Sequence, residues 1–149
     1  MAGISVLFFV TAFFITINVN GLRDPVKRSS FCHWLSCLSP DVVCIQELHC
    51  VSEVEVGSWF PSFSVVSSVG TNKSCGVAVL FKPSFTLVDA VKDSSGRFVR
   101  IRLSRAGASF DVVSLYAPNP RSDRLLFFPS LPPHLDHSVP TLLSHFSKF

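Results

Sequence analysis

Charged side chains are scarce in this chain. They make up 15% of its 149 residues, whereas soluble globular domains average about 25%. Part of the apolar surface is therefore expected to need a covering partner. The formal charge of +3 is mildly basic, and lysine and arginine do not gather into a dense block. Charge alone therefore does not identify a nucleic-acid-binding protein.

The chain also lacks a C-x-x-C pair. Its five cysteines are odd in number and stand among apolar residues, at positions 32, 37, 44, 50 and 75. This usage is typical of buried free thiols. We therefore favour a reducing intracellular location, nuclear or cytoplasmic.

Charge is absent as well from the N-terminal stretch 3–20, whose apolar part imitates the core of a signal peptide. No lysine or arginine precedes that core, and no convincing cleavage site follows it. The apolar run is also short for a membrane span, which needs about 20 residues. We expect an apolar extension over residues 1–13 that leads into a buried strand. A secreted or membrane-anchored protein is the minority alternative.

Length and patterning fit one domain with a single core. Alternation of apolar and polar residues over 14–20 predicts a strand, and Asp24-Pro25 predicts the start of a helix that ends at Ser39-Pro40. The segment 41–47, with its continuous apolar run, predicts a strand that is buried on both faces and ends on a carboxylate. Further strands are expected in an antiparallel meander at 63–69, 76–81, 85–91, 98–103 and 110–116.

The order of these elements predicts an α+β fold. A helical turn at 125–128 and a strand over 139–143 are weaker expectations, because prolines interrupt this part of the chain. The expected architecture is a partial α/β sandwich, mostly one mixed sheet with a flanking helix.

Polar residues stand at the ends of three predicted strands, in the segments Ile17-Asn18-Val19-Asn20-Gly21-Leu22, Ile45-Gln46-Glu47-Leu48-His49 and Ser114-Leu115-Tyr116-Ala117-Pro118-Asn119. Strand ends form a rigid rim on which α/β folds commonly carry their sites. A carboxylate such as Glu47 suits a hard cation such as Mg²⁺, which takes oxygen ligands and keeps waters for a phosphate substrate. Amide oxygens of Asn18 or Asn20 are candidates to assist.

Each of these residues also has an ordinary explanation. Glu47 alone would more often be a solvated residue at a strand end. Asn18 and Asn20 would satisfy backbone groups before the turn at Gly21. Tyr116 would be an ordinary residue of an amphipathic strand. Only the combination of the three segments favours a site.

In this order and spacing, the three segments resemble the first three motifs of the endonuclease/exonuclease/phosphatase family, specifically the apurinic-type endonuclease domain of LINE-class retrotransposons. The resemblance covers about residues 14–128. It implies that Glu47 holds a divalent metal, Mg²⁺ or Mn²⁺, and that Asn20 stands at a metal position where other members have aspartate. It implies that Asn18 supports the metal and phosphate site, that Tyr116 lies beside the scissile phosphate of DNA, and that Asn119 orients the catalytic groups.

Two later motifs of that family, Gly-Asp-x-Asn and Ser-Asp-His, do not occur in the sequence. Residues 139–143 resemble the strand that leads into the first of them, but the chain continues as Ser144-His145-Phe146. Asp136-His137 precedes this position and is given no catalytic role. We therefore expect a truncated or frame-shifted domain over 14–143 and a divergent tail over 144–149.

The retained motifs address only charge stabilisation at the phosphate, whereas hydrolysis also needs an activated water and help for the leaving oxygen. The expected function is that of a remnant Mg²⁺-dependent DNA endonuclease with little or no activity. Weak or no DNA binding and no small-molecule cofactor are expected for the fragment. Aggregation is a risk, because the fragment would supply mainly the first sheet of the family fold and leave its inner face uncovered.

Two alternatives stay open. One is a small non-enzymatic protein with an N-terminal signal or anchor, and the other is residual DNA or metal binding without cleavage. His49 has no clear chemical duty in this reading. A basic strand faces either DNA phosphate or solvent, through the arginines at positions 97, 100, 102 and 105.

Overall fold

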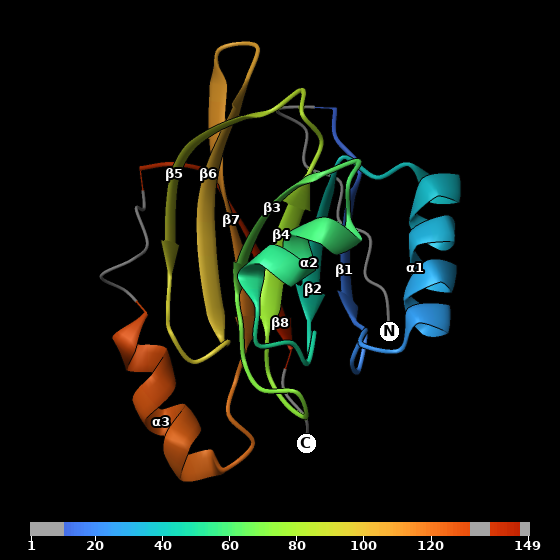
Figure 1. The fold of residues 1–149 in the computed structure, drawn as a ribbon. Helices are drawn as coiled ribbons and strands as arrows, with labels where there is room; N and C mark the ends of the chain where they lie inside the picture. Colours follow the sequence, from blue (N-terminus) through green and yellow to red (C-terminus); the bar gives the residue numbers. More distant parts are fainter. Residues whose placement is uncertain (1–10, 132–137, 147–149) are drawn as a thin grey trace.

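The computed structural model describes residues 11–131 and 138–146. Within these ranges the chain forms three helices and eight strands (Figure 1), in the order β1 (Phe14–Asn18), α1 (Pro25–Leu38), β2 (Val42–Gln46), α2 (Glu53–Trp59), β3 (Ser64–Ser68), β4 (Val77–Phe81), β5 (Thr86–Lys92), β6 (Phe98–Arg105), β7 (Ala108–Tyr116), α3 (Arg121–Ser130) and β8 (Thr141–Phe146).

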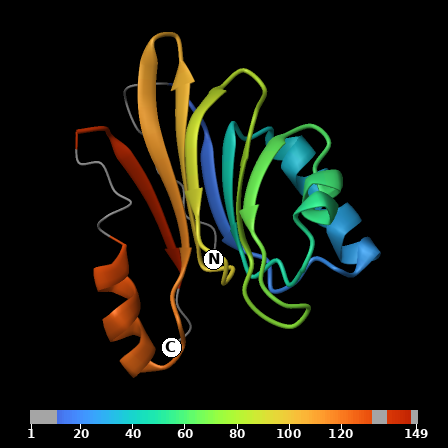
Figure 2. The same ribbon diagram turned by 60° about the vertical axis from the view of Figure 1, so that its left-hand side comes forward.

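The strands form two four-stranded mixed sheets. The first sheet has the order β1-β2-β4-β3, with β1 and β2 parallel and the other neighbours antiparallel. The second has the order β5-β6-β7-β8, with β7 and β8 parallel. Figure 2 shows the two sheets packed face to face, with α1 and α2 outside the first and α3 outside the second.

The main core lies between the two sheets. It joins inward-facing residues of the first sheet, such as Cys44 and Val79, to those of the second, such as Ile101 and Val112. Because strand side chains alternate between faces, the other faces bind the helices. Leu35 of α1 and Val56 of α2 are buried over the outer face of the first sheet.

Local sequence explains where α1 begins and ends. The Asp24 carboxylate accepts a hydrogen bond from the Val26 N–H at 2.9 Å, and Pro25 occupies the first turn, where a missing N–H costs nothing. The helix ends at Ser39, whose left-handed conformation lets its N–H donate to the Leu35 carbonyl. The helix predicted from Asp24-Pro25 to Ser39-Pro40 is confirmed.

The α+β class and the sandwich architecture are confirmed, but the expectation of mostly one sheet needs correction. After β4, a tight turn in which the Phe85 N–H donates to the Lys82 carbonyl leads the chain into the second sheet. The strands of the predicted meander therefore belong to two sheets, and the chain passes from one to the other between β4 and β5. The inner face of the first sheet is covered by β6 and β7, so the physical reason given for aggregation is wrong. Aggregation itself stays a prediction.

The two elements predicted near the C-terminus are present, whereas other predictions fall outside the described residues. The helical turn expected at 125–128 belongs to α3, and the strand expected at 139–143 is β8, which continues to Phe146. Residues 1–10 of the predicted extension and the Asp136-His137 dipeptide lie outside the described residues. No helix in the described part of the chain is both long and apolar enough to cross a membrane.

Candidate active site

Parallel pairing of β1 with β2 brings two of the three motifs to one edge of the first sheet. Asn18 lies opposite Gln46, and the Val19 N–H continues the pairing by donating to the Gln46 carbonyl at 3.0 Å. The third motif, at the end of β7, is tied to the same place by the Gln46 side chain, whose Nε2 donates to the Ser114 hydroxyl at 3.2 Å. The predicted site segments therefore meet.

Glu47 is the centre of this group. Its side chain is only 2% exposed, although it immediately follows a strand. Oε1 accepts a hydrogen bond from Asn18 Nδ2 at 3.0 Å, and Oε2 lies 3.2 Å from His49 Nε2. Because an ionised carboxylate only accepts hydrogen bonds, this contact selects the His49 tautomer that carries its proton on Nε2. The explanation of Glu47 as a solvated residue is excluded.

The backbone around Glu47 has an unusual conformation. Asn20, Glu47 and His49 all have positive φ angles, of 49°, 58° and 58°. Each costs a non-glycine residue of order 1 kcal/mol, and such residues cluster at functional sites. The conformation is held by hydrogen bonds from the Gly21 N–H to the Glu47 carbonyl at 2.6 Å and from the His49 N–H to the Cys75 carbonyl at 3.1 Å.

Gly21 is required at the turn that follows β1. Its φ is +84°, and a Cβ built there would lie 2.8 Å from Nδ1 of His49. A side chain would therefore displace the imidazole that donates to Glu47. The Asn-x-Asn-Gly string thus sets the position of His49 as well as that of Asn18.

Tyr116 contributes its hydroxyl to the same group. Burial, a hydrogen bond to Glu47 and the charge of Glu47 together raise the pKa of Tyr116 to about 12, while the nearby Arg97 acts in the opposite direction. The tyrosine is therefore a neutral donor at physiological pH. The Arg97 guanidinium lies over the Tyr116 ring, 5.3 Å from its centroid.

The two remaining predicted site residues lie on the rim. Asn20 is exposed; its N–H donates to the Asn18 Oδ1 at 2.9 Å, and its carbonyl accepts from Lys27 Nζ at 3.0 Å. Asn119 is exposed in the segment between β7 and α3, and its carbonyl accepts a hydrogen bond from Arg124. The backbone of Asn20 therefore reaches the Glu47 group, and the side-chain roles of both asparagines stay predictions.

The side chains around Glu47 offer few oxygen ligands to a hard cation. Glu47 supplies a carboxylate, and Mg²⁺ is commonly held by one or two carboxylates together with water and substrate phosphates. The Asn18 amide turns its nitrogen toward Glu47, and its oxygen accepts a hydrogen bond from the Asn20 N–H. Among the described residues, no three histidine, cysteine, aspartate or glutamate side chains converge as a metal-binding cluster. A cation at Glu47 would therefore depend on its waters and on the phosphate.

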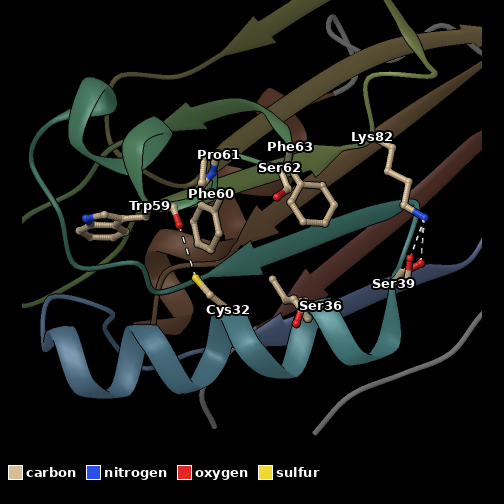
Figure 3. A pocket seen from close by; sticks show the side chains of 10 residues that line it. Cys32, Ser36, Ser39, Trp59, Phe60, Pro61, Ser62, Phe63 and Lys82 are labelled. Carbon is tan, nitrogen blue, oxygen red and sulfur yellow. Dashed lines mark hydrogen bonds between the residues drawn. The ribbon is translucent and has the colours of Figure 1, made fainter.

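A cavity of the described residues lies away from the Glu47 group. It has a volume of about 340 Å³ and lies between α1 and the segment that follows α2. Its apolar walls include Trp59 and Phe60 (Figure 3). The ammonium of Lys82 at its rim is already engaged, because it donates to the carbonyl and hydroxyl oxygens of Ser39 and pairs with Asp41 at 3.2 Å. This cavity lies on the helix-covered side of the first sheet, and its lining residues do not include those of the Glu47 group.

The basic strand predicted to face DNA or solvent is largely engaged inside the molecule. Arg100 pairs with Asp89 at 2.6 Å, and Arg102 binds Asp111 through two hydrogen bonds of 2.8 and 3.1 Å. Only Arg97 lies at the Glu47 end. Sequence reasoning grouped it with the other arginines, and it left His49 without a role. Arg97 lies in the turn before β6, whereas the other three arginines lie within the strand. This difference in position is the feature by which the sequence could have distinguished Arg97.

Comparisons with known proteins identify the family and the fold of the chain. Residues 15–145 match the model of the Endonuclease/Exonuclease/phosphatase family. An uncharacterized 149 kDa protein of transposon TX1 from Xenopus laevis is 30% identical over 125 residues, which are 81% of this chain and 10% of that protein.

Solved structures share the fold. The AP endonuclease LMAP from Leishmania major matches with a TM-score of 0.69 and 21% identity, over 89% of this chain and 54% of that one. TDP2 of D. rerio, in complex with a single-strand DNA product, matches with a TM-score of 0.67 and 13% identity, over 89% and 58%. This chain thus spans about half the length of these solved structures and about a tenth of the transposon protein. On the match over residues 15–145, the chain belongs to the endonuclease/exonuclease/phosphatase family.

Proposed function

We propose that this chain carries the metal- and phosphate-binding part of a Mg²⁺-dependent DNA endonuclease site derived from a LINE-class retrotransposon, and that these 149 residues alone hydrolyse DNA slowly or not at all. The similarity to a protein of transposon TX1 supports the origin. The DNA product bound to TDP2, a protein of the same fold, supports DNA as the ligand.

The observation that carries the proposal is the surroundings of Glu47. A buried carboxylate that meets the Asn18 amide, the His49 imidazole and the Tyr116 hydroxyl is expensive to place there for stability alone, since charged groups lose hydration on burial. Left-handed backbone at Glu47 and His49 adds to the cost. Such features are typical of a preformed binding site.

Glu47 would hold the cation, and the Asn18 amide nitrogen, which donates to Oε1 of Glu47, would position the carboxylate. When bound, Mg²⁺ or Mn²⁺ stabilises negative charge that develops on a phosphate. Tyr116 keeps its proton and donates toward the same region, so this side of the site binds and orients a phosphodiester. Asn20 and Asn119 complete the rim in this proposal.

No residue of this chain is assigned to acid–base catalysis. In-line attack needs a group that activates water and a group that protonates the leaving oxygen, and such acid–base help contributes roughly 10²–10⁴-fold. The Gly-Asp-x-Asn and Ser-Asp-His motifs that would supply these groups in the family do not occur in the sequence. Binding without efficient cleavage is the consequence.

Binding and cleavage are tested separately. Titration of Mn²⁺, followed by electron paramagnetic resonance, should detect one site that weakens by at least about tenfold in Glu47→Gln, as expected for a direct ligand. The matched control is Glu53→Gln, which alters an exposed carboxylate on α2. Equal Mn²⁺ affinity of all three proteins would refute the metal assignment.

Nicking of supercoiled plasmid with Mg²⁺ tests the second part. We expect very slow conversion by the wild-type chain that does not rise above the rate of Glu47→Ala. Efficient nicking that Glu47→Ala abolishes would contradict the proposed inactivity and would mean that the described half-site is sufficient for hydrolysis.

A further inference from the structure

Arg97 is fixed to Tyr116 through its backbone. The Tyr116 N–H donates to the Arg97 carbonyl at 2.8 Å, and the Arg97 N–H donates to Oδ1 of Asp93 at 3.2 Å. Asp93 also accepts hydrogen bonds from the Ser68 hydroxyl at 2.7 Å and the Phe98 N–H at 3.1 Å. The turn that carries Arg97 is therefore anchored to strands of both sheets.

The turn is also locked to the segment beside Glu47. Gly96 has a φ of +74°, and a Cβ there would lie 2.8 Å from backbone atoms of Gly70 and Gly76. The Gly76 N–H donates to the Gly96 carbonyl at 2.9 Å, and the Gly76 carbonyl accepts from the N–H of Leu48, the neighbour of Glu47. This contact between backbones leaves Arg97 little freedom to move relative to the carboxylate.

The side chain of Arg97 lies along Tyr116. One guanidinium nitrogen donates to the Tyr116 carbonyl at 3.2 Å, and the guanidinium carbon lies 5.3 Å from the ring centroid. Among the described residues, no carboxylate forms a salt bridge with Arg97, in contrast to Arg100 and Arg102. A guanidinium has five N–H donors, and the hydrogen bonds to the described part of the chain use one of its nitrogens, which donates to the Tyr116 carbonyl.

We propose that Arg97 binds a phosphate of the DNA backbone, next to the phosphate that Glu47 and Tyr116 address. The inference rests on the proposed function and adds a binding residue to it. Arg97 is partly exposed, and a guanidinium that lies over an aromatic ring is preorganised for bidentate binding of a phosphate. Glu47 supplies the negative charge for a cation, and Arg97 supplies a positive charge that needs no metal.

A matched variant at the far end of β6 distinguishes phosphate binding by Arg97 from a purely structural role. Arg105 also lies over an aromatic ring, 4.2 Å from the centroid of Phe85, and it also donates to a backbone carbonyl, that of Thr11, at 3.0 Å. Arg97→Gln and Arg105→Gln therefore remove similar intramolecular contacts, but only the first removes charge from the Glu47 end.

The experiment measures the affinity of the full chain for a short, fluorescein-labelled single-stranded DNA over a range of salt concentrations, without Mg²⁺. We expect Arg97→Gln to weaken binding about tenfold at low salt. The slope of log affinity against log salt should fall in magnitude by about 0.7–1, the contribution of one phosphate contact. Arg97→Lys should restore the slope, because it restores the charge, and Arg105→Gln should leave the slope unchanged.

The outcomes separate the two proposals. If the wild type binds DNA and Arg97→Gln binds it with the same salt dependence, Arg97 makes no phosphate contact and the inference is overturned, while the proposed function stands. Equal losses in Arg97→Gln and Arg105→Gln also overturn it, because they indicate a general effect on the fold or on net charge. If the wild type shows no salt-dependent binding without Mg²⁺, the inference is overturned, while the Mn²⁺ titration and the nicking assay still test the proposed function.

Discussion

Asp111 pairs two arginines inside the second sheet, so its replacement should strongly destabilise the strand that ends at Tyr116. The side chain is fully buried. Oδ1 and Oδ2 accept hydrogen bonds from Arg102 at 2.8 and 3.1 Å, and Oδ2 lies 3.7 Å from a guanidinium nitrogen of Arg100. Asp111→Asn keeps the volume of the side chain and removes its charge.

The size of the effect follows from burial. Loss of one partner from a buried ion pair costs about 3–5 kcal/mol, because the remaining charge stays desolvated. Arg100 keeps its contact with Asp89, and Arg102 is 22% exposed, so we expect the lower end of this range, about 3 kcal/mol. For a domain of about 150 residues this corresponds to a decrease in Tm of ~6–12 °C.

Urea unfolding, followed by Trp fluorescence and far-UV circular dichroism, measures the change. The control is Asp89→Asn, which removes the other carboxylate partner of Arg100; the Asp89 side chain is 54% exposed, whereas Arg100 is buried. Asp111→Asn should lower the midpoint strongly, and Asp89→Asn should lower it less, because Arg100 keeps its contact with Asp111. A shift in Asp111→Asn no larger than in Asp89→Asn would refute the reasoning from burial.

Two further predictions use groups that can be observed individually. Tyr116 is the chain's single tyrosine, and its pKa is raised from 10.0 to about 12 by burial and by Glu47. Its contribution to stability should therefore be full below about pH 10 and lost as pH rises toward 12. Absorbance titration should give a lower pKa in Glu47→Gln, and a wild-type midpoint near 10 would contradict the contact. Burial also raises the pKa of Cys44 to about 12, whereas Cys37 is exposed. Peptide mapping after brief iodoacetamide treatment should find Cys37 modified and Cys44 modified only in denaturant, and rapid modification of native Cys44 would show that the space between the sheets is open.

The sequence was sufficient for elements with strong local signals. Asp24-Pro25 and the αL residue Ser39 delimit α1 through contacts within a few residues. The uninterrupted apolar run of β2 is buried throughout, as predicted. The sequence also predicted that the strand ends carrying Asn18 and Glu47 lie on one rim, and the structure places the two side chains 3.0 Å apart.

Other features depend on contacts that local patterns do not encode. The short helix α2 begins with a hydrogen bond from the Glu55 N–H to the Ser52 hydroxyl and contains Gly57, a poor helix former; its buried Val56 and Trp59 stabilise it through the first sheet. The division into two sheets depends on the turn at 82–85, and a run of hairpins looks the same in sequence whether or not it changes sheets. The role of His49 depends on left-handed backbone that period-two patterning does not predict.

A single amide explains how motifs far apart in the chain form one group. Nε2 of Gln46, which is almost fully buried, lies within hydrogen-bond distance of hydroxyls on three other strands, to which its two N–H groups donate: Thr16 of β1 at 3.3 Å, Ser114 of β7 at 3.2 Å and Ser144 of β8 at 2.9 Å. Glu47 directly follows this amide and Tyr116 lies two residues after Ser114, so these hydrogen bonds fix the spacing between the carboxylate and the phenol. The residues of the candidate site are thus organised by contacts within residues 16–144. The proposal of binding without cleavage needs no further group to hold this arrangement together.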